Sequence, residues 1–376
     1  MVIKLPLADD YVSNWGIDKA LRELYQNAID REQEKENVQM ISKYYKDRRM
    51  LCVGNQNTKL ESKTLVLGSS TKKGNDSMIG SYGEGYKLAF LVLCREGFKV
   101  SVRNNNEIWH VYLEYDAFFD SDILHIEIEE IESKNQDLIF IISGLLNLDY
   151  EKYKEDNLRL SPPKQKNETK YGDRLAEQKY EKAVFVSGLY VCHVKDKFLY
   201  GYNIKPQYIH LDRDRTQVDE YAMASVCSKI NAEIANAGAH DTLFDEITKK
   251  KSRDVAYIQQ HLVDDVKKEL STQIYKSFKK KYGKHAYPIY YYNDESEAKT
   301  LKGAVPVEVS HTERELIYQN DEFIKDKKNF EKEDVKTPWQ RLEEFKEKYA
   351  ELFSPKLYDL FESLIMDYAK TWELKD

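Results

Sequence analysis

Three polar residues with helical spacing lie near the start of the chain. Glu23, Asn27 and Asp30 are four and three residues apart, so on a helix their side chains fall within roughly 60° of one another. The apolar residues of the same segment fall on the other side: Leu21, Leu24, Tyr25, Ala28 and Ile29. The pattern predicts a helix over residues 13–36 that buries one face. Its other face presents two carboxylates and an amide together.

A glycine cluster comes later in the chain and leads into an apolar helix predicted over residues 85–95. Gly80, Gly83 and Gly85 have no Cβ atom, so the backbone there can approach phosphate groups and direct N–H groups at them. The positive end of the following helix would add to this attraction. Lys87 could neutralise a phosphate oxygen. The cluster therefore has the chemistry of a phosphate-binding turn.

The segment before this cluster, residues 68–80, is polar and rich in small residues. Such a composition suits a mobile lid over a binding site. Thr71 offers a hydroxyl group, and Lys72 or Lys73 could neutralise a phosphate when the lid closes. The segment is therefore expected to contribute to a nucleotide site.

The helical triplet suits hydrolysis of a phosphoanhydride. Glu23 is the natural general base, because a carboxylate one water away from a γ-phosphate can orient and deprotonate that water. Asn27 can give its amide oxygen to Mg²⁺, which usually keeps several waters and takes few protein ligands. Asp30 can reach the nucleotide or its ordered waters. Together the helix and the glycine cluster indicate a nucleotide hydrolase.

At this point the sequence resembles a family. Residues 22–30 resemble the N-terminal box of the GHKL ATPases, which include gyrase B, heat-shock chaperones, histidine kinases, MutL and MORC-type proteins. Residues 67–72 and 79–89 are similar to the lid and the second glycine box of that family. The resemblance covers about residues 10–150. It implies an α/β sandwich that binds ATP with Mg²⁺.

The resemblance also implies roles for individual residues. By position, Glu23 would be the catalytic base and Asn27 the metal ligand. The other nucleotide-binding residues implied by position or by chemistry are Asp30, Asn55, Thr71, Lys72, Gly80, Gly83, Gly85 and Lys87.

One motif departs from the family pattern. The first glycine box of the family is Asp-x-Gly-x-Gly, and its Asp accepts a hydrogen bond from the adenine amino group. Here Asn55 takes the place of the Asp and Asn57 that of the first Gly. An amide oxygen can still accept from an amino group, and Asn tolerates left-handed backbone angles. Selectivity for adenine is therefore open, and another nucleotide remains an alternative.

The expected fold class is α+β. The resemblance implies a Bergerat-type sandwich, a mixed but mostly antiparallel sheet with helices on one face. A small transducer-like α/β region and a mostly helical C-terminal region would follow it. The domain boundaries expected are 1–160, 161–240 and 241–376. Alternation and short gaps predict an antiparallel meander of four strands, at 98–103, 107–115, 123–129 and 137–144.

The rest of the chain gives a coarser pattern. A short strand is expected at 50–53, a helix at 60–67, and a linker or loop at 161–179. A strand pair at 184–191 and 197–204, a helix ending near 236 and a charged helix at 254–282 follow. A β-α-β unit is expected over 287–309, an exposed charged segment over 320–336, and helices over 338–374 with a break at 354–355.

The strand pair and the residues after it resemble the transducer region of gyrase-like and MORC-like proteins. There a lysine often reaches the γ-phosphate, and Lys195, Lys197 and Lys205 are candidates. Arg213 and Arg215 are either sensors or members of a structural ion-pair cluster, with structure favoured. No chemical motif is found beyond residue 220.

Composition limits the class of protein. The chain has 376 residues, a net charge of −7 and four scattered cysteines, which indicates a cytoplasmic protein with reduced thiols and no zinc site. No apolar run is long enough for a membrane span. The net charge gives no overall attraction to nucleic acid, although basic runs occur at 249–253 and 276–284.

Two functions compete. The first is a slow, Mg²⁺-dependent ATPase that acts as a conformational switch, with lid closure promoting a homodimer or capture of a protein partner. The second is a scaffold that does not hydrolyse nucleotide and binds a partner protein, because its first glycine box is degenerate. A role in DNA metabolism or in phage or bacterial defence would suit either function, and the C-terminal region would serve as the interaction module.

Overall fold

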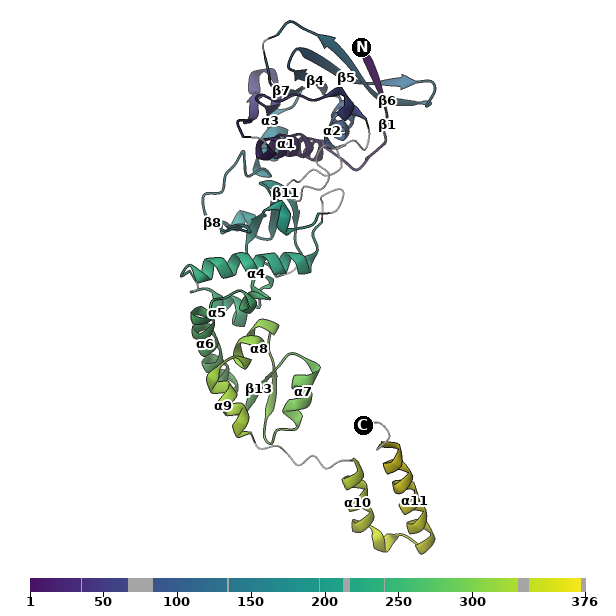
Figure 1. Cartoon of the computed structure of the whole chain (residues 1–376), viewed down its shortest axis with the longest axis vertical. Helices are drawn as coiled ribbons and strands as arrows, with labels where there is room; N and C mark the ends of the chain where they lie inside the picture. Colours follow the sequence, from purple (N-terminus) through teal and green to yellow (C-terminus); the bar gives the residue numbers. More distant parts are fainter. Residues whose placement is uncertain are drawn as a thin grey trace. The chain divides into compact units, whose positions relative to one another are not determined.

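The structure is a computed structural model, and it describes residues 1–34, 36–66, 84–133, 135–195, 197–211, 217–239, 241–330 and 338–372. The chain divides into two compact units, Met1–Val263 and Asp264–Asp376 (Figure 1). The expected lid at 68–80, with Thr71, Lys72 and Gly80, lies outside the described residues. So do Gly83, Arg213 and Arg215.

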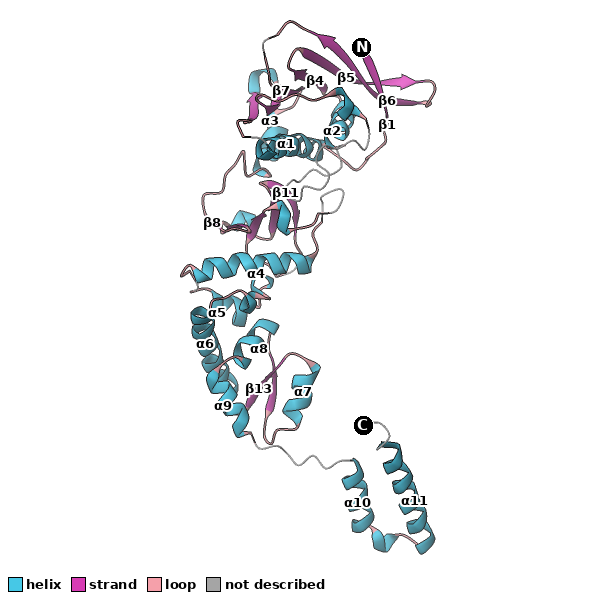
Figure 2. Ribbon diagram, in the orientation of Figure 1, coloured by secondary structure: helices cyan, strands magenta, loops and turns pink. Residues whose placement is uncertain are grey.

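The first unit begins with a seven-stranded sheet, coloured magenta in Figure 2, in which every neighbouring pair is antiparallel. The spatial order is β1-β6-β5-β4-β7-β3-β2. The strands are β1 (Val2–Ala8), β2 (Met40–Tyr45), β3 (Met50–Asn55), β4 (Lys99–Asn104), β5 (Glu107–Asp116), β6 (Ser121–Glu130) and β7 (Leu138–Ser143).

The four strands predicted after the glycine cluster are confirmed. The prediction that they form a meander in sequence order is wrong for the fourth strand, β7. β4, β5 and β6 are consecutive neighbours, whereas β7 pairs with β4 and β3. The edge of β6 is already taken by β1, so β7 completes its hydrogen bonds between β4 and β3. The α+β fold class is confirmed.

Helices α1 (Ile17–Glu34) and α2 (Gly85–Arg95) pack side by side on one face of this sheet (Figure 1). The apolar residues of α1 predicted to face the core are all buried, and every residue of α2 from Tyr86 to Leu93 is buried. The prediction of a helix at 60–67 is wrong. Among the described residues of this segment, only Ser62–Leu65 are helical, and they form a short 3₁₀ helix. The side chain of Asn104 holds both backbone groups of Leu60, which fixes this loop on β4.

Helix α3 (Asn147–Glu155) leads from the first sheet to a second sheet of five strands, in the order β11-β10-β12-β9-β8. These are β8 (Lys166–Glu168), β9 (Gly172–Leu175), β10 (Ala183–Val186), β11 (Leu189–His193) and β12 (Gly201–Ile204). β10 and β12 are parallel and the other pairs are antiparallel. Helix α4 (Glu220–Asn236) follows and is capped by Asp219, which accepts from the backbone N–H of Ala222.

Two sequence expectations about this region are wrong. The segment expected as a linker at 161–179 contains β8 and β9, because short strands with polar residues leave little hydrophobic periodicity. The single strand expected at 184–191 is a hairpin, β10 and β11. Its two central residues, Ser187 and Gly188, both have positive φ angles, 51° and 87°. This is the geometry of a type I′ turn, whose twist matches that of the strands.

Helix α1 also contacts the segment that leads into the second sheet. The ring of Tyr25 stacks on that of Tyr153 in α3, with ring centroids 5.3 Å apart. Glu32, near the end of α1, forms an ion pair with Arg159. Arg159 in turn packs against Gly188 of the hairpin, where a Cβ atom would lie 3.2 Å from its Cγ. One helix therefore joins the two sheets of this unit.

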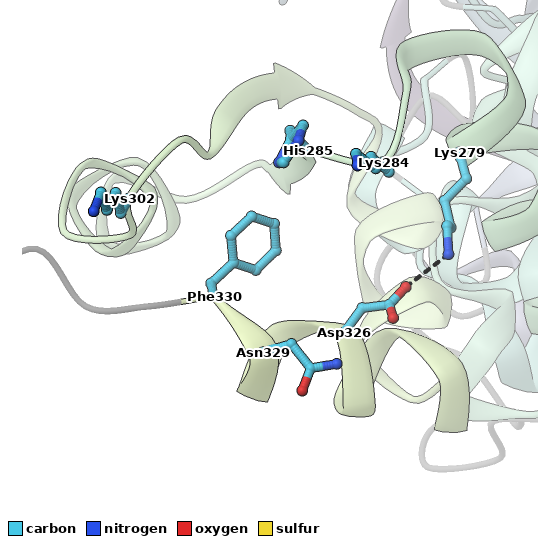
Figure 3. A pocket seen from close by; sticks show the side chains of 7 residues that line it. All are labelled: Lys279, Lys284, His285, Lys302, Asp326, Asn329 and Phe330. Carbon is cyan, nitrogen blue, oxygen red and sulfur yellow. Dashed lines mark hydrogen bonds and ion pairs between the residues drawn. The ribbon is translucent and has the colours of Figure 1, made fainter.

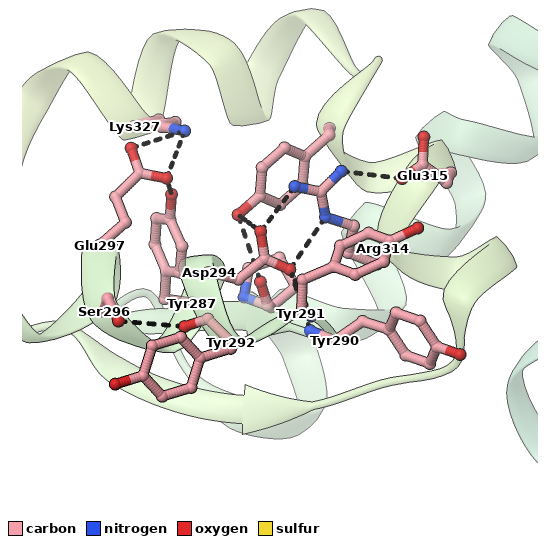
Figure 4. A network of polar contacts seen from close by, with 12 residues as sticks. Tyr287, Tyr290, Tyr291, Tyr292, Asp294, Ser296, Glu297, Arg314, Glu315 and Lys327 are labelled. Carbon is pink, nitrogen blue, oxygen red and sulfur yellow. Dashed lines mark hydrogen bonds and ion pairs between the residues drawn. The ribbon is translucent and has the colours of Figure 1, made fainter.

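The second unit contains the predicted β-α-β unit, which is confirmed. Strands β13 (Ala286–Ile289) and β14 (Val305–Glu308) are parallel and are joined by helix α7 (Tyr292–Lys299). The carboxylate of Asp294 accepts hydrogen bonds from the backbone N–H groups of Tyr290 and Tyr291. It also forms an ion pair with Arg314 (Figure 4). This network fixes the turn between β13 and α7.

The remaining helices are α5 (Leu243–Asp245), α6 (Asp264–Tyr282), α8 (His311–Tyr318), α9 (Asp321–Asn329), α10 (Pro338–Lys348) and α11 (Pro355–Trp372). The charged helix expected from residue 254 begins only at Asp264, because Asp254 is held in a buried network with Tyr202 and Ser252. Helix α9 lies in the segment expected to be merely exposed. The break at 354–355 is confirmed, since Pro355 opens α11. None of the described helices has the length and apolar character needed to span a membrane.

The close pairing of β3 with β7 generates the first prediction. A Cβ atom at Gly54 would lie 1.9 Å from the backbone oxygen of Leu138, so no side chain fits there. Gly54→Ala should lower the free energy of unfolding by about 2 kcal/mol or more, since backbone must shift to relieve the overlap. Urea unfolding followed by circular dichroism measures this. Lys43→Ala, on an exposed position of β2, is the control, and equal stabilities of the two variants would contradict the prediction.

Candidate active site

The polar triplet of α1 is buried. The side chains of Glu23 and Asp30 belong to residues that are 2% and 0% exposed, and Asn27 is half-buried. A polar helix face that merely met solvent would be open to water. Burying a carboxylate is costly unless it is paired or hydrogen-bonded, so two buried carboxylates on one helix face indicate a structural or chemical use. This burial marks the Asn27 face of α1 as a candidate site.

Helix α2 begins directly against this face. A Cβ atom placed on Gly85 would lie 2.1 Å from Oε2 of Glu23 and 3.7 Å from Nδ2 of Asn27. The first turn of α2, with its positive helix end, therefore touches the carboxylate of Glu23. The structure thus brings together three of the predicted site residues, which come from two separate motifs. The other glycines of the cluster, Gly80 and Gly83, are not among the described residues.

Asn27 is oriented by its own helix. Its Nδ2 donates to the backbone oxygen of Glu23, at 2.8 Å. Because the amide nitrogen is held at the helix backbone, the amide oxygen is turned away from it and is the atom available to a cation. Within the described residues no group of three or more His, Cys, Asp or Glu side chains could hold a metal ion. A single amide oxygen fits Mg²⁺ that takes its remaining ligands from phosphate and water.

Glu23 has a positive neighbour. The guanidinium of Arg22 lies 3.6 Å from its Oε1, and Arg22 itself is 9% exposed. The opposite charge compensates part of the cost of burying the carboxylate. The site therefore combines a carboxylate, a guanidinium and an amide within two turns of one helix.

Lys87 is fully buried and its Nζ donates to the backbone oxygen of Val66, at 2.8 Å. Burial lowers the pKa of this lysine below its ordinary value, and the nearby Glu84 opposes the shift. The ammonium group thus links α2 to the last described residue before the lid segment. Its predicted phosphate contact remains a prediction, and in this structure the group serves the backbone.

Asn55 ends β3 and lies against α1. Its Nδ2 donates to the backbone oxygen of Ala28, at 2.8 Å, and the residue is 1% exposed. A carboxylate cannot donate this hydrogen bond, so the amide has a structural reason to stand where the family has Asp. Asn57 has a φ of 51°, a left-handed backbone angle that Asn tolerates.

Thr58 is a residue that the sequence does not single out. It is 6% exposed, and its Oγ1 has no hydrogen-bond partner in the part of the chain that the structure describes. Its backbone is held firmly, since its N–H donates to Gln136 and its oxygen accepts from Asn105. The hydroxyl of Thr58, three residues after Asn55, is therefore available to hydrogen-bond a polar atom of a ligand. No periodicity or spacing could have revealed it.

Of the lysines considered after residue 190, Lys205 is engaged elsewhere. Its Nζ donates to the backbone oxygen of Lys170, at 3.0 Å. It lines a cavity of about 540 Å³ together with Gln33 and Arg159, and Glu23, Asn27 and Gly85 are not among the residues that line it. Lys195 and Lys197 are exposed. A lysine contact to a γ-phosphate therefore stays a prediction without a chosen residue.

Comparisons with known proteins give partial matches. Residues 148–236 match the family described as the Mycoplasma pneumoniae MPN635 N-terminal domain. No curated protein matches the chain. Among solved structures, the ATPase region of Saccharomyces cerevisiae topoisomerase II is similar at 10% identity and a TM-score of 0.33, covering 46% of this chain and 62% of that one. The same yeast region bound to ICRF-187 (dexrazoxane) is similar at 9% identity and a TM-score of 0.33, with the same coverage.

A third structure comprises the ATPase and transducer domains of DNA topoisomerase II from Balamuthia mandrillaris. It is similar at 14% identity and a TM-score of 0.25, and the match covers 36% of this chain and 38% of that one. The chain thus spans less than two thirds of the length of each of these structures. Similarities of this size assign no activity, so the function must be argued from the residues of the site.

The burial of Lys87 generates the second prediction. Because its pKa is lowered in the folded state, the unfolded chain binds more protons between that pKa and the ordinary value of 10.5. Its contribution to stability should therefore become less unfavourable as the pH rises through this window. Lys87→Met removes the titrating group, so the stability of the variant relative to the parent should fall as the pH rises.

Urea unfolding at a series of pH values measures this difference. Lys99→Met, at an exposed position of β4, is the matched control and should run parallel to the parent at every pH. A Lys87→Met curve that also runs parallel to the parent would show that the lysine is not perturbed.

Proposed function

We propose that this protein is a Mg²⁺-dependent GHKL-type ATPase whose nucleotide state controls its conformation. One observation carries the proposal. Gly85 of the second glycine motif fits against Glu23 and Asn27 of the helical motif so closely that a Cβ atom would overlap Oε2 of Glu23. Two motifs that are far apart in the sequence thus lie in contact, and this contact supports the proposal.

In the proposed reaction Glu23 accepts a proton from the water that attacks the γ-phosphate. Its burial excludes bulk water and strengthens its interaction with that water. The N–H groups at the start of α2 would hold the phosphates, since the helix end is positive and Gly85 allows close approach. Gly80, Gly83, Thr71, Lys72 and Lys87 would complete the phosphate contacts.

Asn27 would hold Mg²⁺ through its amide oxygen. When bound, the ion would neutralise phosphate charge, and the nucleotide and water would supply its remaining ligands. Asp30, one further turn along α1, would bind ordered waters or the nucleotide itself. The hydrogen bond from Asn27 to the Glu23 backbone fixes the side chain, so the cost of ordering it is met before the ion binds.

Base recognition would involve Asn55 and Thr58. The amide nitrogen of Asn55 is occupied by Ala28, which leaves its oxygen as the acceptor for an exocyclic amino group. Adenine offers such a donor, so ATP is the proposed nucleotide. The hydroxyl of Thr58, which has no hydrogen-bond partner among the described residues, would contact a second position of the base.

At the level of the whole chain we propose a slow cytoplasmic switch. Nucleotide binding would order the lid, promote a homodimer and control a protein partner of the C-terminal region, in DNA metabolism or in phage or bacterial defence. The division into an ATP-binding region to residue 160, a transducer-like region to 240 and a C-terminal region belongs to this proposal. The second candidate, a scaffold without hydrolysis, is favoured by one observation only, the amide in place of Asp at residue 55.

The third prediction separates binding from hydrolysis. Glu23→Ala should bind ATP with Mg²⁺ as the parent does, but should lose at least about a hundredfold in turnover, because the general base is absent. Phosphate release and calorimetry measure the two properties. Glu34→Ala removes an exposed carboxylate from the end of the same helix and should keep the parental rate. Parental turnover by Glu23→Ala would exclude the assigned base.

The fourth prediction concerns Mg²⁺ and distinguishes the two candidate functions. ATP at 100 times its dissociation constant should stabilise the parent by about 2.7 kcal/mol. Asn27→Ala should lose the Mg²⁺-dependent part of this stabilisation, since the amide oxygen is removed. Thermal unfolding with ATP, ADP and GTP, each with and without Mg²⁺, measures it. No stabilisation of the parent by any nucleotide would favour the scaffold.

A further inference from the structure

Helices α10 and α11 form a helical hairpin near the end of the chain (Figure 1). The contacts between its two helices are mainly aromatic. The ring of Phe361 in α11 lies 6.0 Å from that of Phe345 in α10 and 5.3 Å from that of Phe353, measured between ring centroids. An ion pair of 2.9 Å also links Lys346 in α10 to Glu362 in α11. These contacts hold the two helices together as one unit.

Helix α11 also carries an exposed apolar stripe. Leu357, Leu360 and Leu364 are three and four residues apart, so they lie along one line of the helix, and they are 50%, 60% and 61% exposed. This is the spacing of the core positions in helices that pack on another helix. None of the hairpin side chains whose exposure the structure describes is buried. Helix α11 therefore has more apolar surface than α10 covers.

Helix α10 and the turn after it follow the same spacing, with Leu342, Phe345, Tyr349 and Leu352. Phe345 is 48% exposed and Leu352 is 79% exposed. These two side chains and the three leucines of α11 offer on the order of 500 Å² of apolar surface in each chain. Two such hairpins would bury about 1,000 Å² together, which reaches the lower limit for a specific interface. Exposed apolar surface of this extent commonly marks an interaction site.

The size of the hairpin also indicates a partner. A unit of fewer than about 40 residues usually needs a disulfide, a metal ion or association with another chain to stay folded. The four cysteines of the chain, of which Cys227 is the last, all precede the hairpin. Among the residues that the structure describes, no group of three or more His, Cys, Asp or Glu side chains could hold a metal ion. Association is the means of stabilisation that remains.

The cavities described in residues 264–330 do not suit this apolar surface. One cavity of about 460 Å³ is lined by lysine, histidine, acidic and amide side chains together with the ring of Phe330 (Figure 3). That ring already lies 6.2 Å from the ring of Tyr287, between centroids. A second cavity, of about 390 Å³, is lined by charged, hydroxyl and amide side chains. An apolar helix that covered either cavity would desolvate these polar groups without pairing them.

We propose that the partner of this hairpin is the hairpin of a second copy of the chain, and that the two hairpins pack as a four-helix bundle. A two-fold axis brings the same surface of both copies together, so an apolar stripe is complementary to its own copy. The exposed polar residues of α11 carry both signs of charge, as Lys356 and Asp359 show, so two copies do not present one repelling charge. This pairing needs no nucleotide, unlike the homodimer of the proposed function.

The test is sedimentation velocity with the full chain, without nucleotide or Mg²⁺, over a range of protein concentrations. The parent should sediment with twice the mass of one chain. Leu364→Glu should weaken self-association at least about a hundredfold, since each dimer would have to bury two unpaired charges. Ser363→Glu is the matched control. It adds the same charge at the neighbouring exposed position, about 100° around the helix, and should remain a dimer.

A second variant and a second measurement separate association from folding. Leu357→Glu, at another position of the stripe, should dissociate the dimer as Leu364→Glu does. Circular dichroism checks that the remainder of each variant is folded. A monomeric parent, a dimer that persists in Leu364→Glu, or dissociation by Ser363→Glu would each overturn the proposal. A dimer that forms only with ATP and Mg²⁺ would overturn it as well, while leaving the proposed ATPase intact. An inactive ATPase does not affect this test, because no nucleotide is present.

Discussion

The contact between Gly85 and Glu23 is the constraint on which the rest of the first unit depends. Helix α2 can begin against the carboxylate only because residue 85 has no side chain. This approach aligns the positive end of one helix with a buried acid of another, and it places Asn27 beside both. Any nucleotide chemistry in this chain would follow from that alignment. The two helices cover one face of a single antiparallel sheet, which holds them in position.

Much of this arrangement could be predicted from the sequence. The apolar positions of α1 recur with a helical period, and the strands that became β4 to β7 alternate, so both were recognised from local pattern. The order of the strands could not be recognised in this way. β1 pairs with β6 over a long sequence distance, and β7 pairs with β4 instead. Strands β8 and β9 were missed for a related reason. They are short and polar, and only their partners define them.

The sequence predicts which residues could form the site, but not their burial or their hydrogen-bond partners. Spacing alone put Glu23, Asn27 and Asp30 on one face, yet it could not show that both carboxylates of this face are buried or that Gly85 of α2 lies against Glu23. The role of Asn55 was likewise hidden, because its amide donates to the backbone of Ala28, twenty-seven residues away in sequence. Burial and the direction of a hydrogen bond are properties of the assembled chain.

The double attachment of α1 has a mechanical consequence. Its middle carries Glu23 and Asn27 together with Tyr25, whose ring stacks on Tyr153 of α3. Its C-terminal end is tied through Glu32 and Arg159 to the β10–β11 hairpin of the second sheet. A rigid rod anchored at one end transmits a small tilt over its whole length. A displacement of this rod by a fraction of an ångström at the carboxylate would reach the hairpin as strain on an ion pair and a packed turn. A movement of α1 at Glu23 would therefore change the contacts that α1 makes with the second sheet.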